Sequence, residues 1–135
     1  MLSFETEIDF ELIGICTHHS DYRLVWGVNQ QLGVLLTKCD DPFVVTGKKG
    51  QILSSHSWYS FTDEETLLEM YLIKNKMDGK FLIPERSQID YFLFLRENHL
   101  EDVQELVGKL KHINSVMAAY EFEPSELPSA ELIVF

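Results

Sequence analysis

The stretch IPERSQIDYFLFL, residues 83–95, decides the fold of this chain. Its second half, residues 89–95, is apolar apart from Asp90. An apolar run of this length is typical of a central strand that is buried on both faces. Pro84 cannot donate a hydrogen bond to a sheet ladder, so the first half of the stretch is expected to form an edge or a connecting loop. The sequence therefore predicts a loop that leads into a central strand.

A helix and another strand are expected to follow the central strand. Asn98 can cap a helix because Glu101 lies three residues later, and Asn114 can end it. The apolar residues of this helix are spaced by three and four: Leu100, Val103, Leu106, Val107, Leu110 and Ile113. Alternation of apolar residues then predicts a strand over residues 116–122. This strand, helix and strand together are similar to half of a ferredoxin-like fold.

The first third of the chain predicts a strand and a helix. Apolar and acidic residues alternate over residues 4–12, and residues 13–16 are apolar on both faces, which predicts one strand over residues 4–16. Ser20 can cap the helix, whose apolar stripe is Leu24, Val25, Val28, Leu32, Leu35 and Leu36. Gly27 and Gly33 each cost this helix about 1 kcal/mol relative to alanine. We therefore expect another element to approach closely at both glycines.

The middle of the chain predicts a meander of strands. Residues 46–57 are rich in Gly, Ser and Lys and predict a flexible loop or a loose hairpin end, and residues 58–61 predict a short aromatic strand. The segment TDEE, residues 62–65, fits either a helix capping box or a hairpin turn. Bulky and β-branched residues favour a strand over residues 65–74, and Asp78 with Gly79 indicates a turn. Residues 132–135 are also typical of a strand.

This order of elements predicts an α+β fold, in which two helices pack on one face of a largely antiparallel sheet of five to six strands, partly ferredoxin-like. At 135 residues, the chain is expected to form a single domain over residues 1–135. The formal net charge of −11 disfavours binding to nucleic acids and to anionic membranes. Cys16 and Cys39 form no CxxC motif, and residues 1–7 are acidic where a secretory signal is basic, so we expect a cytoplasmic protein.

Several residues of the loop match a known pattern. They are Ile83, Pro84, Glu85, Asp90 and Tyr91, with Ile89 in place of a valine. In these positions the chain resembles a family of uncharacterised bacterial proteins named for the pattern IPExxxVDY. The segments DYRL, residues 21–24, and LIKNK, residues 72–76, are also similar to that family. The resemblance covers most of the chain and implies no activity.

The loop also supplies the candidate ligand-binding residues, which are Pro84, Glu85, Arg86, Asp90, Tyr91 and Lys76. Two carboxylates and a tyrosine at the entrance to a buried strand can bind a cation or act as acid and base. The favoured interpretation is that Glu85 and Asp90 brace the loop, by accepting hydrogen bonds from backbone amides or by pairing with a nearby arginine or lysine.

A metal site and a positive patch are weaker candidates. His18 and His19, with Asp21, could ligate zinc or nickel, but neighbouring side chains in an extended segment point to opposite faces, which favours a solvated strand end. Six of the eleven basic residues could form a local positive patch if their segments converge, and they are Lys48, Lys49, Lys74, Lys76, Lys80 and Arg86. A solvated loop rim is the simpler interpretation.

Two functions fit these features. The chain contains no GxSxG motif, so the leading hypothesis is a non-enzymatic binding or protein-interaction module without a cofactor, with a homodimer through a sheet edge or a helix face as the candidate assembly. The alternative is a small enzyme that uses Glu85 and Asp90 on an anionic or sugar-like substrate. Nucleic-acid binding ranks third, because it requires a contiguous positive patch.

Overall fold

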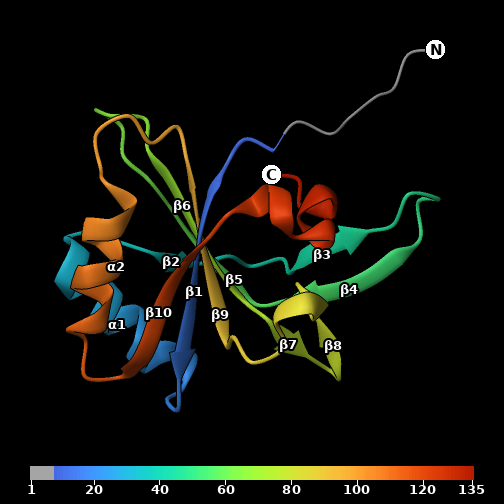
Figure 1. Ribbon diagram of the computed structural model, residues 1–135, viewed down its shortest axis with the longest axis horizontal. Helices are drawn as coiled ribbons and strands as arrows, with labels where there is room; N and C mark the ends of the chain where they lie inside the picture. Colours follow the sequence, from blue (N-terminus) through green and yellow to red (C-terminus); the bar gives the residue numbers. More distant parts are fainter. Residues whose placement is uncertain (1–7) are drawn as a thin grey trace.

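A six-stranded sheet lies at the centre of the computed structural model, which describes residues 8–135 (Figure 1). The strand order is β10-β1-β9-β6-β5-β2, and every neighbouring pair is antiparallel. Its strands are β1 (Glu11–Thr17), β2 (Thr37–Lys38), β5 (Trp58–Thr62), β6 (Glu69–Lys74), β9 (Tyr91–Arg96) and β10 (Val116–Phe122). Two separate hairpins pair β3 (Phe43–Thr46) with β4 (Ile52–His56) and β7 (Lys76–Met77) with β8 (Lys80–Phe81). The predicted central strand is confirmed as β9, between β1 and β6.

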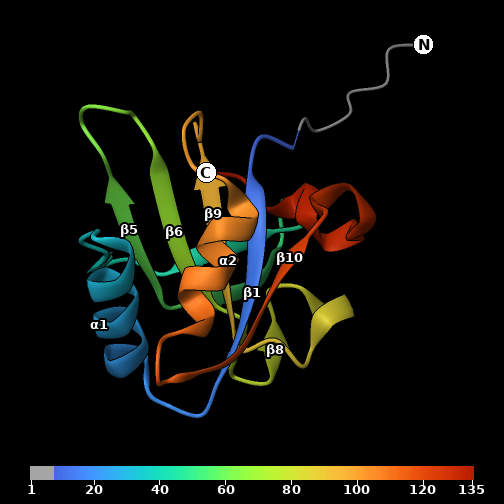
Figure 2. The same cartoon turned by 60° about the vertical axis from the view of Figure 1, so that its left-hand side comes forward.

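Four strands and two helices follow the ferredoxin-like order. Helix α1 (Asp21–Leu32) leads from β1 towards β6, and helix α2 (Val103–Lys111) leads from β9 to β10. Strands β1 and β6 are parallel to each other because both are antiparallel to β9, which separates them. Strands β9 and β10 are also parallel to each other, because both are antiparallel to β1, which lies between them. Both helices cover one face of the sheet (Figure 2), which confirms the predicted α+β fold.

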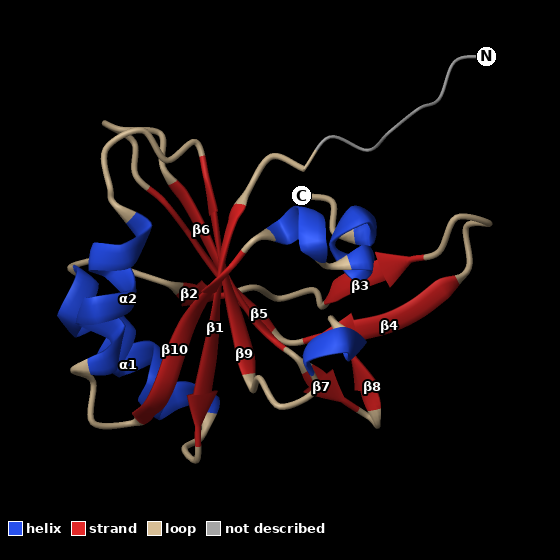
Figure 3. Cartoon of the chain, in the orientation of Figure 1, coloured by secondary structure: helices blue, strands red, loops and turns tan. Residues whose placement is uncertain are grey.

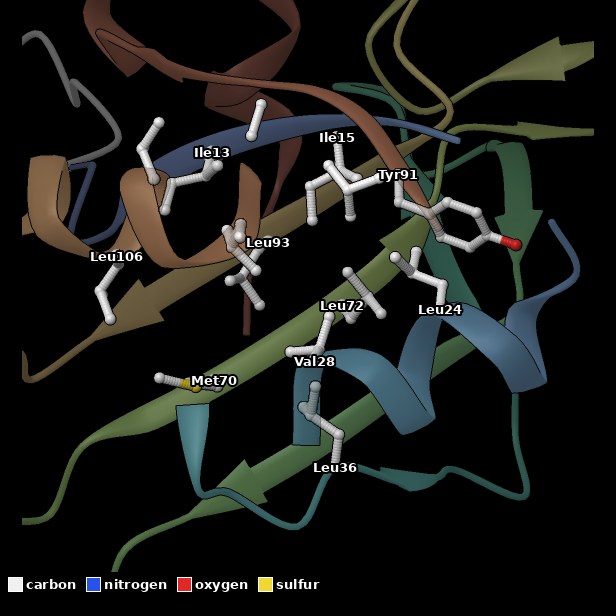
Figure 4. Close-up of a cluster of buried hydrophobic side chains, with 14 of the residues drawn as sticks. Ile13, Ile15, Leu24, Val28, Leu36, Met70, Leu72, Tyr91, Leu93 and Leu106 are labelled. Atoms are coloured by element: carbon white, nitrogen blue, oxygen red, sulfur yellow. The ribbon is translucent and has the colours of Figure 1, made fainter. Parts of the chain in front are cut away.

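The sheet carries a buried layer on each face, which explains the apolar run in β9. Tyr91, Leu93 and Leu95 point to the helix face, where they join side chains of α1 and α2 (Figure 4). Phe92 and Phe94 point to the other face. That face is covered by the β3–β4 hairpin and by three short 3₁₀ helices, η1 (Pro84–Arg86), η2 (Pro124–Glu126) and η3 (Pro128–Leu132) (Figure 3).

Helix α1 is shorter than its apolar spacing predicts. It ends at Leu32 because Gly33 adopts a left-handed conformation, with φ of 65°, and caps the helix. The predicted continuation through Leu35 and Leu36 is therefore wrong, and so is the expected close contact at Gly33, where a Cβ atom would meet nothing within 4 Å. The close contact at Gly27 is confirmed, because a Cβ atom there would lie 2.5 Å from a methyl group of Ile113.

Helix α2 begins later than predicted. Asp102 is the N-cap, and its carboxylate accepts a hydrogen bond from the first turn of the helix. Asn98 instead accepts the backbone N–H of Glu101 at 3.0 Å in the preceding loop, so this loop imitates a cap without starting a helix. The helix ends with His112 as its C-cap rather than at Asn114. Neither helix in residues 8–135 has the length and hydropathy to cross a membrane.

The two chain ends also differ from the predictions. Strand β1 starts at Glu11, residues 8–10 are not in a strand, and residues 4–7 of the predicted strand lie outside the described residues. The predicted strand over residues 132–135 is wrong, because Pro128 begins the 3₁₀ helix η3, after which Ile133 and Phe135 pack on the same face of the sheet as Phe92 and Phe94. In the middle of the chain, the strand predicted over residues 65–74 is confirmed over residues 69–74, and the hairpin turn before it is confirmed and extends through residue 68.

Candidate functional site

The signature loop, residues 83–90, is held by Asn75, which is fully buried. Its side-chain oxygen accepts the backbone N–H of Ile83 at 3.0 Å. Its side-chain nitrogen donates to the carbonyl oxygens of Arg86 at 3.0 Å and Ile89 at 2.8 Å. One amide group therefore satisfies three backbone groups along the loop and fixes its path into β9. The sequence interpretation missed Asn75, although it lies within the LIKNK segment that resembles the family.

Glu85 braces the loop against the C-terminal segment. Its carboxylate accepts hydrogen bonds from the hydroxyl of Ser129 and, at 2.9 Å, from the backbone N–H of Ser129. Burial by itself raises the pKa of the Glu85 carboxyl, but the bonds from Ser129 and the charge of Arg86 outweigh burial and lower that pKa below its ordinary value. The Arg86 guanidinium donates to the Glu85 carbonyl oxygen at 2.9 Å and lies 5.5 Å from the centre of the Phe122 ring. Pro84 is exposed at the start of η1.

Asp90 and Tyr91 make a different set of contacts at the start of β9. The backbone N–H of Thr17 donates to the Asp90 carboxylate at 2.8 Å. The Tyr91 hydroxyl points out of the helix-face core (Figure 4) and donates to the carboxylate of Asp21, at the first residue of α1. Burial, and then this hydrogen bond, raise the pKa of the Tyr91 hydroxyl above its ordinary value. Lys74 pairs with Tyr91 across the sheet, and its ammonium lies 3.8 Å from the same Asp21 carboxylate.

These contacts border an open cavity of about 470 Å³, which we name the Tyr91 cleft. Three segments distant in sequence line it, with Phe81: Thr17, His18, His19, Ser20 and Asp21, then Lys74 and Lys76, then Ser87, Ile89, Asp90 and Tyr91. No salt bridge among the described residues uses Lys76, whose ammonium lies 5.7 Å from the centre of the Phe81 ring. The cleft therefore combines two ammonium groups, two carboxylates and two imidazoles at the N-terminus of α1.

The candidate residues divide into two groups. Lys76, Asp90 and Tyr91 line the cleft, whereas Pro84, Glu85 and Arg86 do not. The two carboxylates that the enzyme hypothesis uses therefore do not share a cavity. The other members of the expected positive patch, which are Lys48, Lys49, Lys80 and Arg86, also lie outside the cleft lining.

The two histidines share the cleft with Asp21 and Lys74. His18 and His19 are both exposed there, beside Asp21. Residues 8–135 contain no group of three or more His, Cys, Asp or Glu side chains that could hold a metal ion. Asp21 was considered only as a metal ligand and Lys74 only as part of the positive patch, although the segments DYRL and LIKNK contain them.

The chain matches no protein-family model, and no curated protein or solved structure is detectably similar to it. The resemblance to the IPExxxVDY pattern therefore rests on the residues quoted above and stays a prediction.

Proposed function

We propose that this protein is a non-enzymatic binding module that takes a small anion into the Tyr91 cleft. The observation that supports the proposal most is the convergence of residues 17–21, 74–76 and 87–91 on one cavity. These three segments contain most of the positions that resemble the family pattern, apart from the positions that brace the loop. Concave cavities with a few convergent polar groups are the usual sites of small ligands.

The charges of the cleft favour a ligand with an anionic group. Lys76 has no ion-pair partner within residues 8–135, and the 3.8 Å separation of Lys74 from Asp21 leaves donors of its ammonium group free. The N-terminus of α1 adds the positive partial charge of the helix dipole, and the side chain of Ser20 makes no capping hydrogen bond that would occupy the N–H groups there. A carboxylate or phosphate is the ligand group that these features attract.

The carboxylates of the cleft favour a ligand that also carries a hydrogen-bond donor. Asp90 uses one carboxylate oxygen for the N–H of Thr17, and its other oxygen has no hydrogen-bond donor within residues 8–135. A hydroxyl or amino group of the ligand can donate to that oxygen. The preferred ligand is therefore a hydroxy acid, an amino acid or a phosphate ester.

Binding is favoured over catalysis by the position of Glu85. A general acid and a general base must reach the same substrate, yet the Glu85 carboxylate is occupied by Ser129 outside the cleft. A cytoplasmic location is part of the proposal, since Cys16 and Cys39 are free thiols and a reducing compartment keeps them so.

Calorimetric titration with citrate, glycine and inorganic phosphate tests this function. At least one of them should bind, and Lys76→Ala should weaken that binding about tenfold, as expected for the loss of one charge-assisted hydrogen bond. The matched control is Lys80→Ala, which removes an exposed lysine of the neighbouring hairpin outside the cleft and should leave the affinity unchanged. Equal losses in both variants, or no binding of any of the three anions, would contradict the proposal.

A further inference from the structure

Strand β10 leaves one edge of the sheet open. It pairs with β1 on one side, and no strand within residues 8–135 pairs with its other side (Figure 3). The opposite edge of the sheet is protected, because β2 has only two residues, both exposed, and one of them is Lys38. Short strands and edge lysines are devices that prevent pairing with another chain. The two edges of the sheet therefore differ in how they are protected.

The sequence of β10 contains neither lysine nor proline, and its one charged residue is Glu121. Met117 and Tyr120 are large apolar side chains that are 61% and 51% exposed. A β-bulge interrupts the pairing with β1 near Thr17, but residues 118–122 lie in regular register with residues 12–16. The regular part of this edge can accept another strand without rearrangement.

Helix α2 lies beside the same edge and has a charge pattern that complements itself. Its Gln104 side chain donates to Glu121, which places the first turn of α2 over the C-terminal end of β10. Glu105 lies in that first turn and Lys111 in the last turn. Gly108 lies midway between them, is exposed and has nothing within 4 Å of a Cβ atom, so packing within the chain does not require a glycine there. A glycine inside a helix costs about 1 kcal/mol relative to alanine.

We propose that this surface, β10 with the exposed side of α2, docks a second copy of the same chain. Two β10 strands pair antiparallel about a twofold axis near Tyr120, and the two α2 helices lie antiparallel above them. This arrangement joins the two six-stranded sheets into one continuous sheet.

The twofold symmetry makes the contacts of this dimer complementary. Tyr120 meets its own counterpart, and Ala118 lies opposite Phe122 of the second copy, which pairs a small side chain with a large one. Above the strands, an axis near Gly108 sets Glu105 of each copy against Lys111 of the other. The glycine allows the two helices to approach closely at the axis.

Analytical ultracentrifugation of the full chain tests the dimer. The protein should sediment with twice the mass of one chain, and Tyr120→Lys should raise the dimer dissociation constant about tenfold or more, because it sets two like charges against each other at the axis. The matched control, Tyr22→Lys, changes a tyrosine that is 78% exposed on α1 and should leave the dissociation constant unchanged. Circular dichroism checks that both variants are folded.

A charge reversal separates this interface from any other. Glu105→Lys and Lys111→Glu should each weaken the dimer, and the double variant should restore it, because both pairs across the axis are again of opposite charge. A protein that stays monomeric overturns the proposal. A dimer that Tyr120→Lys does not weaken, or one whose charge-reversal effects simply add, overturns it as well.

Discussion

Asn75→Ala should be among the most destabilising single substitutions in this chain. The Asn75 side chain is fully buried and satisfies backbone groups of Ile83, Arg86 and Ile89. Alanine leaves those three groups without their partner. Each buried polar group that loses its hydrogen bond costs about 1–3 kcal/mol. Because the loop can relax and admit water, we expect the free energy of unfolding to fall by about 3–5 kcal/mol in total.

Such a loss is a large share of the stability of a domain, which is typically about 5–15 kcal/mol. Urea unfolding followed by circular dichroism and by tryptophan fluorescence measures it. Asn114→Ala is the matched control, because Asn114 is exposed, and its effect should stay within about 0.5 kcal/mol. If Asn75→Ala costs less than about 1 kcal/mol, or no more than the control, Asn75 does not hold the signature loop.

Two further substitutions test the brace and the cleft separately. Glu85→Gln should lower the free energy of unfolding by about 1 kcal/mol at neutral pH, because it weakens the contacts with Ser129. The lowered pKa of Glu85 stabilises the fold at pH values above the ordinary carboxyl pKa of 4.5. In acid-unfolding curves, the stabilities of wild type and variant should therefore converge as the pH falls below that value. Parallel curves would contradict this. Tyr91→Phe removes a hydroxyl whose raised pKa stabilises the fold up to its ordinary pKa of 10.0, with the contribution lost as the pH rises further. The wild type should therefore lose more stability than the variant in alkaline unfolding curves, and an equal loss would show that the bond to Asp21 adds nothing.

The sequence predicts the centre of the fold better than its ends. The apolar run over residues 89–95 identifies β9, because a strand that is covered on both faces buries its odd-numbered and its even-numbered side chains alike. The chain end at residues 132–135 is also apolar, but Pro128 starts a 3₁₀ helix that runs to Leu132. At the start of α2, the sequence cannot distinguish Asn98 from Asp102, because the side chains of both accept a hydrogen bond from a nearby backbone N–H. Only Asp102 is the N-cap of the helix.

The sequence predicts only some residues of the candidate site, because the contacts of the site join segments that are distant in the sequence. The pattern indicates Asp90 and Tyr91, but their partners Thr17 and Asp21 lie 73 and 70 residues away. Only the register of the strands decides that Lys74 lies beside Tyr91. A local pattern carries no information on that register. The segments that resemble the family pattern contain Asp21, Lys74, Asp90 and Tyr91, but the resemblance assigns no role to these residues.

We propose that Asp90 and Tyr91 face a ligand cleft while Glu85 and Asn75 brace the loop behind it. A titration of isotope-labelled protein with the anion that binds best, followed by NMR of the backbone amides, distinguishes these two roles. The largest changes in chemical shift should fall on residues 17–21, 74–76 and 87–91, with little change at Ser129. Changes centred on the C-terminal segment around Ser129, or spread evenly over the surface, would contradict it.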